Sequence, residues 1–315
     1  SRSVASGEHF SALMAQGGRL NATTWFDRTN YFETVPVGAL DLALWLEADR
    51  HGYLLEAVNQ ANLDNQRDVV KEEKRQRYDN APYGNAMRDI YATVFPEGHP
   101  YHHPTIGSMA DLDAASVRDV HEFFAAHYRP ANTVLTLVGD IEPEDGVARV
   151  ARYFESLPSH AHTASAPPDP LPALETPQRL DVVAEVPNDR LHIAFRLPVE
   201  TERDFLAADL ALEAFAGLSM SRLVRRLVRQ DQLANSVSAH AMGFIGGVSL
   251  GLIAIDIAHD VDHALVESVF LEELTAFLAI GPTPTEMEAA LAQSERAWLQ
   301  ALASQEERAD LISHY

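Results

Sequence analysis

The 315-residue chain is 46% hydrophobic and 22% charged, which is enough for two globular domains with real cores and excludes a disordered chain. Its net charge of -22 argues against a nucleic-acid or anionic-membrane surface, and the absence of cysteine leaves only His, Asp and Glu as metal ligands. No apolar run approaches the ~18 residues of a membrane span, and Ser1 begins no charged-then-apolar leader, so we expect a cytoplasmic protein.

Periodicity predicts an α+β unit in the first half of the chain. A helix over 6–15 ends at two glycines, and the alternating residues of 19–37 predict a hairpin. The further elements are predicted as helices over 40–50, 65–78, 84–95, 114–127 and 142–156 and a buried strand over 132–139. Residues 96–107, PEGHPYHHPTIG, contain several turn-forming Gly and Pro residues and predict an ordered loop.

The helix over 65–78, NQRDVVKEEKRQRY, is the most strongly charged element. Asp64 is predicted to cap its start, and Gln66, two valines and Glu73 fall on one face at helical spacing. This face carries a carboxylate beside apolar side chains. It either contributes to a metal site or belongs to a solvated helix whose charges pair along its surface.

The composition changes to Pro, Ala, Ser and Thr over 158–177, which predicts a linker between a domain over 1–157 and a domain over 178–315. The second domain is predicted to contain strands over 179–186, 190–197, 236–242 and 248–257 and helices over 202–216, 219–228, 262–279 and 283–304. The repeated order predicts an α+β fold of two homologous domains, each an antiparallel-rich sheet with helices on one face. We expect the second domain to be incomplete, because it lacks a closing strand and helix.

Several motifs resemble the pitrilysin/insulinase family of zinc peptidases, which includes mitochondrial processing peptidases. They are GGRLNATT over 17–24, DRTNY over 27–31, RDVV over 67–70, and YRPAN over 128–132 followed by LTLVGD over 135–140. The resemblance implies that family's metallopeptidase fold, in which an inverted H-x-x-E-H motif supplies two histidine ligands and a glutamate base. Glu73 matches the family's third zinc ligand. Gln66 stands where the family often has a glutamate that orients this ligand.

H-x-x-E-H is absent from the chain, and the family spacing places it before Ser1. We therefore expect the first domain to lack its first strands and its H-x-x-E-H helix. No catalytic residue is then assigned within the chain. The complete protein is expected to hold zinc, whereas the chain as given is predicted to hold none and to be inactive.

His9 and the three histidines between 99 and 103 are not predicted to be metal ligands. Glu8 and His9 do not fit the motif, because Ala5 stands where its first histidine should be. The three histidines between 99 and 103 are interpreted as part of a structural or solvent-facing loop. Pro100 and Pro104 prevent the helical presentation that zinc helices use.

The resemblance also implies a mode of substrate binding. Asn21, Ala22, Thr23 and Thr24 would form the edge strand to which an extended peptide adds through backbone hydrogen bonds. The other interpretation of Asn21 is a hairpin residue that satisfies its own turn. The mechanism implied is attack of a zinc-activated water on a peptide carbonyl, with the motif's glutamate taking the proton.

The leading interpretation is a zinc-dependent metalloendopeptidase that cleaves unfolded or extended peptides. The alternative is a non-catalytic family member that binds peptides or supports a partner subunit, and an unrelated acidic α+β scaffold ranks last. The expected partner is an extended peptide, with no nucleic acid and no membrane. A homodimer or a heterodimer with another family subunit stays open.

Overall fold

The computed structural model describes residues 1–157, 171 and 174–314. By their contacts, these residues form two units. The first contains residues 1–74, 105–157 and 299–314, and the second contains 75–104, 171 and 174–298. Most of the predicted linker over 158–177 lies outside the described residues, and the domain boundaries at 157 and 178 stay a prediction. Residues 75–104 group with the later part of the chain, a grouping that the sequence analysis did not predict.

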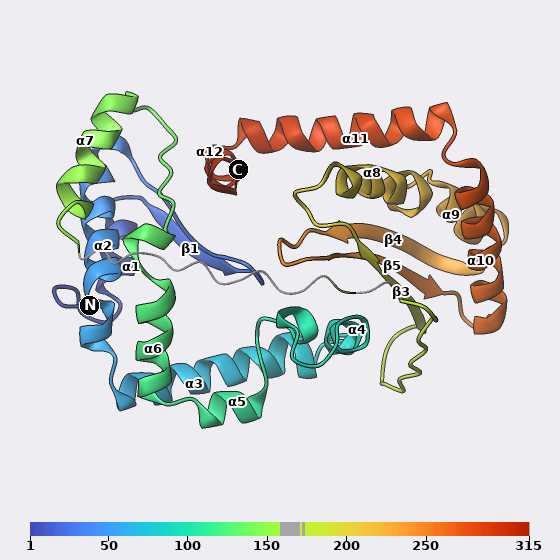
Figure 1. The fold of residues 1–315 in the computed structure, drawn as a ribbon, viewed down its shortest axis with the longest axis horizontal. Helices are drawn as coiled ribbons and strands as arrows, with labels where there is room; N and C mark the ends of the chain where they lie inside the picture. The colour runs from blue at the N-terminus through green and yellow to red at the C-terminus, as the bar shows by residue number, and fades with distance from the viewer. Residues whose placement is uncertain (158–170, 172–173, 315) are drawn as a thin grey trace. The chain divides into compact units, whose positions relative to one another are not determined.

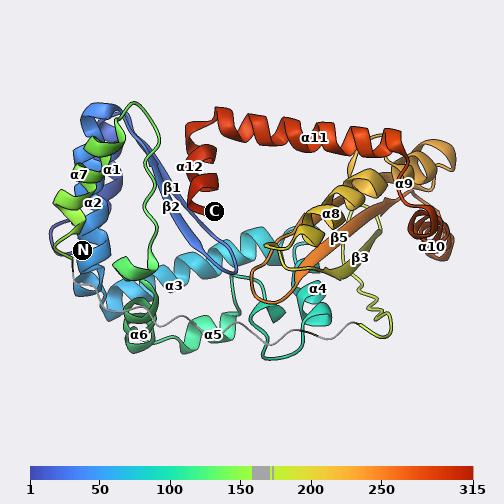
Figure 2. The same cartoon turned by 45° about the horizontal axis from the view of Figure 1, so that its top comes forward.

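The first unit is built on the predicted hairpin. Strands β1 (Arg19–Thr24) and β2 (Thr29–Thr34) pair antiparallel, and the Trp25 amide donates to the Arg28 carbonyl at 2.8 Å across the turn. Helices α1 (Glu8–Ala15) and α2 (Leu40–Tyr53) pack beside this hairpin (Figures 1 and 2). Their shared core contains the buried side chains of Val4, Leu13, Ala43 and Leu46, with Leu20 and Val35 packed against them.

The remaining helices of the first unit are α3 (Gln60–Lys74), α5 (Met109–Ala114), α6 (Val117–His127), α7 (Pro143–Phe154) and α12 (Gln305–His314), with short 3-10 turns at Val37–Ala39, Leu54–Ala57 and Pro130–Asn132. The predicted helix over 114–127 is interrupted, because Ser116 caps α6 in a reciprocal capping box with Asp119. Helix α12 was not predicted. It contacts β2, where the Asn30 side-chain amide donates to the Asp310 carboxylate at 2.7 Å.

Two sequence predictions in this unit are wrong. Asp64 does not cap the charged helix: α3 begins at Gln60, and the Asn59 carboxamide accepts from the Asn62 amide at 3.0 Å. The predicted buried strand over 132–139 forms no ladder with any described segment, and Val134 is 71% exposed. A pattern of apolar residues does not make a strand without a partner backbone.

The second unit contains a three-stranded antiparallel sheet in the order β3 (Arg190–Leu197), β5 (Ser249–Ile257) and β4 (Ala234–Met242). Its helices are α4 (Ala86–Val94), α8 (Arg203–Leu212), α9 (Arg222–Val224), α10 (His263–Ile280) and α11 (Pro284–Ala303), with π-helical turns at Arg75–Asp79, Glu213–Gly217 and Arg225–Gln230 and a 3-10 turn at Pro100–His102. The predicted strand over 179–186 pairs with no described strand, so it forms no ladder. Val183 in this segment is fully exposed.

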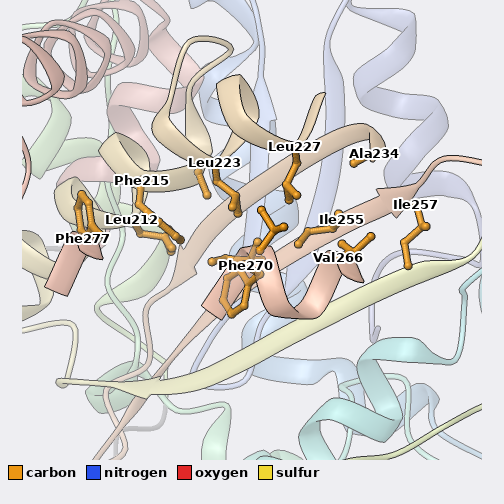
Figure 3. Packing of buried hydrophobic residues seen from close by; sticks show 13 residues of the cluster. Leu212, Phe215, Leu223, Leu227, Ala234, Ile255, Ile257, Val266, Phe270 and Phe277 are labelled. Carbon is orange, nitrogen blue, oxygen red and sulfur yellow. The ribbon is translucent and has the colours of Figure 1, made fainter. Parts of the chain in front are cut away.

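One face of this sheet carries the largest hydrophobic core of the second unit. Alternate residues of the central strand, Ile253, Ile255 and Ile257, belong to this core. Figure 3 shows Ile255 and Ile257 among the side chains of the helices. They meet buried side chains from α8, α9, α10 and the turns that continue α8 and α9, which are Leu212, Phe215, Leu223, Leu227, Val266, Phe270 and Phe277. This arrangement confirms the predicted antiparallel sheet with helices on one face. Among the described helices, none has the length and apolar character needed to cross a bilayer.

Candidate functional site

Strand β1 presents an exposed backbone edge. It pairs with β2 on one side, and no strand among the described residues pairs with its other side. Because Trp25 and Arg28 are a hydrogen-bonded pair, the alternation of an antiparallel ladder makes Thr23 and Asn21 bonded positions as well. The backbone groups of Ala22, between them, therefore point away from β2. The side chains of all four residues from Asn21 to Thr24 are exposed.

The Asn21 side chain covers part of this edge. Its carboxamide oxygen accepts from the Ala22 amide at 2.9 Å. This bond lies within β1 and not in the turn, and it occupies the same amide that an added strand would use. A peptide that pairs with Ala22 must displace one side-chain hydrogen bond.

Helix α3 carries the two other predicted site residues. Glu73 is half-buried in its last turn, and Gln66 is exposed about two turns earlier on the same face. The helix is fixed by Arg67, which donates to the carbonyls of Leu112 and Ala115 at 2.7 Å each. This role of the arginine in the RDVV motif was missed by the sequence analysis, because both acceptors are backbone atoms of a distant segment.

Glu73 does not lie in a ready-made metal centre of the described residues. The one group of three close His, Asp or Glu donors found among them is His9, Glu33 and Glu47. That group does not include Glu73, so the role of Glu73 as a zinc ligand stays a prediction.

The cluster of His9, Glu33 and Glu47, here called the α1–α2 cluster, joins three elements of the first unit. The His9 Nε2 atom lies 2.8 Å from Glu33 Oε1 and 3.5 Å from Glu47 Oε1. Glu47 also forms a two-point ion pair with Arg50. Burial raises the pKa of the Glu33 carboxyl above its ordinary value, against the opposing effect of its hydrogen bond with His9.

The histidine loop of the second unit is structural, as the prolines suggested. The His99 ring is buried and stacks on Phe95 at 5.3 Å between centroids, and burial lowers its pKa. The His102 ring bonds the Phe95 carbonyl at 2.8 Å, and the His103 ring bonds the Pro104 carbonyl at 3.2 Å. The three imidazoles thus have separate partners and form no shared site.

Comparison with known proteins decides the family. A family model described as the peptidase M16 inactive domain matches residues 114–294. The chain belongs to the peptidase M16 family. This is the pitrilysin family of metallopeptidases that its motifs resemble.

Individual proteins of known sequence or structure are similar to the chain. The chain is 29% identical over 247 residues to the zinc protease PqqE of Helicobacter pylori, covering 76% of this chain and 54% of that protein. Its fold matches the crystal structure of a Helicobacter pylori protease with a TM-score of 0.91, at 24% identity, over 100% of this chain and 75% of that one. A chain of Complex III2 from Candida albicans shares the fold with a TM-score of 0.71 at 16% identity, over 98% and 75% of the two chains. The chain spans between about a third and about half of the length of the curated relatives that it matches.

Proposed function

We propose that the whole M16 protein is a zinc-dependent metalloendopeptidase acting on extended peptides. In it, this chain contributes the peptide-binding edge of β1 and one metal ligand, Glu73. The observation that carries the proposal is the exposed edge at Asn21–Thr24 in a chain whose relative in Helicobacter pylori is named a zinc protease. The proposal concerns the whole protein because H-x-x-E-H does not occur in these 315 residues.

The β1 edge explains how an M16 chain can hold peptides of different sequence. An extended peptide placed alongside β1 exchanges hydrogen bonds with outward backbone groups such as those of Ala22. These bonds involve no peptide side chain, so they give affinity with little sequence preference. Pairing also fixes the direction and the register of the peptide backbone, which orients each peptide carbonyl relative to β1.

The second candidate function is a non-catalytic subunit that binds peptides or supports a partner. It is favoured by the presence of this fold in a chain of Complex III2, and by Gln66 standing where the family often has a glutamate. Such a subunit would act as a homodimer or a heterodimer. The two functions differ in cleavage by the whole protein and agree in peptide binding by β1.

The β1 edge is tested by Ala22→Pro, which removes the outward amide and adds a ring where the peptide backbone should lie. We expect a fluorescein-labelled, unstructured peptide to bind at least about tenfold more weakly, because a backbone hydrogen bond contributes about 1 kcal/mol and the ring also blocks approach. Fluorescence anisotropy measures the affinity.

Ala22→Ser is the matched control, since it keeps the amide and changes only an exposed side chain. Both variants are compared with the original chain by circular dichroism. If the proline variant is folded and binds the peptide as tightly as the serine variant, β1 is not the binding edge.

A further inference from the structure

The α1–α2 cluster brings together three metal-binding side chains from different elements. His9 comes from α1, Glu33 from β2 and Glu47 from α2, and their donor atoms all lie within 4.8 Å of one another. The side chains are 21%, 11% and 23% exposed, respectively. The cluster is therefore largely shielded from solvent, although each of its side chains keeps some exposure.

Packed elements hold these donors in place. His9 lies about one turn before Leu13, and Glu47 directly follows Leu46, and both leucines are buried in the core of the first unit. Glu33 is held by the register of the hairpin, where it stands opposite Leu20. Donors on rigid helices and strands lose little freedom when they bind an ion, unlike exposed acidic groups on loops.

The cluster holds two carboxylates beside one arginine. Glu33 and Glu47 contribute two carboxylates, and Arg50 forms its ion pair with Glu47. The Arg50 guanidinium lies 3.8 Å from the centroid of the Tyr31 ring, which fixes its position. Glu33 instead faces His9, whose Nε2 atom lies 2.8 Å from Glu33 Oε1. A second cation near Glu33 would offset the cost of its burial.

We propose that His9, Glu33 and Glu47 bind a divalent first-row transition-metal ion, of which Zn²⁺ is the probe of choice. Imidazole nitrogen and carboxylate oxygen suit such ions, and three protein ligands leave room for water in the coordination sphere. His9 coordinates through Nε2, and its ring proton then resides on Nδ1. Arg50 keeps its contact with Glu47 and orients that ligand from outside.

This site ties α1 to β2 and α2, and it does not include Glu73. It replaces the expectation from sequence that the chain as given holds no stoichiometric zinc and that His9 is no ligand. It is also independent of the proposed function, because neither β1 nor α3 supplies a donor to it.

The experiment is a titration of the chelator-treated 315-residue chain with Zn²⁺ by isothermal calorimetry. We expect one ion to bind per chain, and at least about tenfold weaker binding by His9→Gln and by Glu33→Gln. Glu122→Gln on α6 removes an exposed carboxylate and is the matched control, so it should bind Zn²⁺ like the original chain. Absence of saturable binding, or His9→Gln binding as tightly as the control, would overturn the proposal.

A second measurement does not depend on the folding of any variant. In ¹⁵N-labelled original chain, the His9 ring shows by NMR which nitrogen carries the proton. Addition of Zn²⁺ should shift Nε2 to a metal-bound position and leave the proton on Nδ1. If the NMR signals of the His9 ring nitrogens did not change at saturating Zn²⁺, His9 would not be a ligand and the proposed site would be wrong.

Discussion

Glu73→Gln in the whole M16 protein should reduce peptide cleavage at least about 100-fold and remove one zinc ion per chain. Loss of a partner that merely orients a metal ligand weakens binding or activity by about 10- to 100-fold, so loss of the ligand itself should cost no less. The carboxamide of Gln is neutral and a poorer zinc ligand than a carboxylate. The readouts are zinc by elemental analysis and cleavage of a quenched fluorescent peptide.

Glu72→Gln is the control for this prediction. It removes a neighbouring carboxylate of α3 that is exposed, whereas Glu73 is half-buried. Both variants are measured in a Glu33→Gln background, so that the α1–α2 cluster does not contribute zinc. Equal zinc content and equal cleavage in the two variants would remove Glu73 from the metal site.

The second large effect is expected on stability, at the ion pair between Arg222 and Glu286 in the second unit. These side chains are only 13% and 9% exposed, and the Arg222 Nη2 atom lies 2.7 Å from Glu286 Oε2. The Thr283 amide donates to the same oxygen at 2.8 Å. The Arg222 guanidinium is the main cause that lowers the pKa of Glu286 from 4.5 to about 2.

The lowered pKa gives the sign of the pH dependence. The folded state holds the charged form of Glu286 more tightly than the unfolded state does, so the stabilisation is present above pH 4.5 and is lost as the pH falls toward about 2. A shift of this size corresponds to roughly 3 kcal/mol. Glu286→Gln should lower the free energy of unfolding by about that amount at pH 7, because Arg222 is left buried without its charge partner.

Urea denaturation of both proteins at pH 7 and pH 3 measures this effect. Between pH 7 and pH 3, the free energy of unfolding should fall less for Glu286→Gln than for the original chain. The exposed pair of Arg118 and Glu122, at 83% and 60% exposure, supplies a control in which Glu122→Gln changes the stability by less than about 0.5 kcal/mol. If Glu286→Gln and Glu122→Gln lowered the free energy of unfolding by similar amounts at pH 7, the low exposure of the Arg222–Glu286 pair would not contribute to stability.

The sequence predicted elements whose signals are local. The hairpin followed from its alternating residues and short turn, and α10 followed from its apolar periodicity. The structure adds a cap at Asp262, whose carboxylate accepts from the Ala264 amide at 3.0 Å. The failed strands had similar apolar patterns. Val134 and Val183 are exposed because strand formation depends on a partner backbone, which a local pattern does not report.

The candidate site residues also divide into those that a local sequence motif could predict and those that meet only through packing. Asn21–Thr24 and Glu73 lie in motifs that resemble a known family, so their positions could be named from sequence. The grouping of His9 with Glu33 could not, since these residues are 24 positions apart and meet only through the packing of α1 on the hairpin. His9 was set aside because Ala5 breaks the H-x-x-E-H motif, whereas its partners Glu33 and Glu47 lie on other elements.

The most direct test of the proposed function is a crystal structure of the whole M16 protein grown with Zn²⁺, with anomalous scattering recorded at the zinc edge. The account predicts an anomalous peak about 2.0–2.2 Å from a carboxylate oxygen of Glu73. Anomalous peaks only at other residues, with the Glu73 carboxylate remote from every zinc ion, would contradict it.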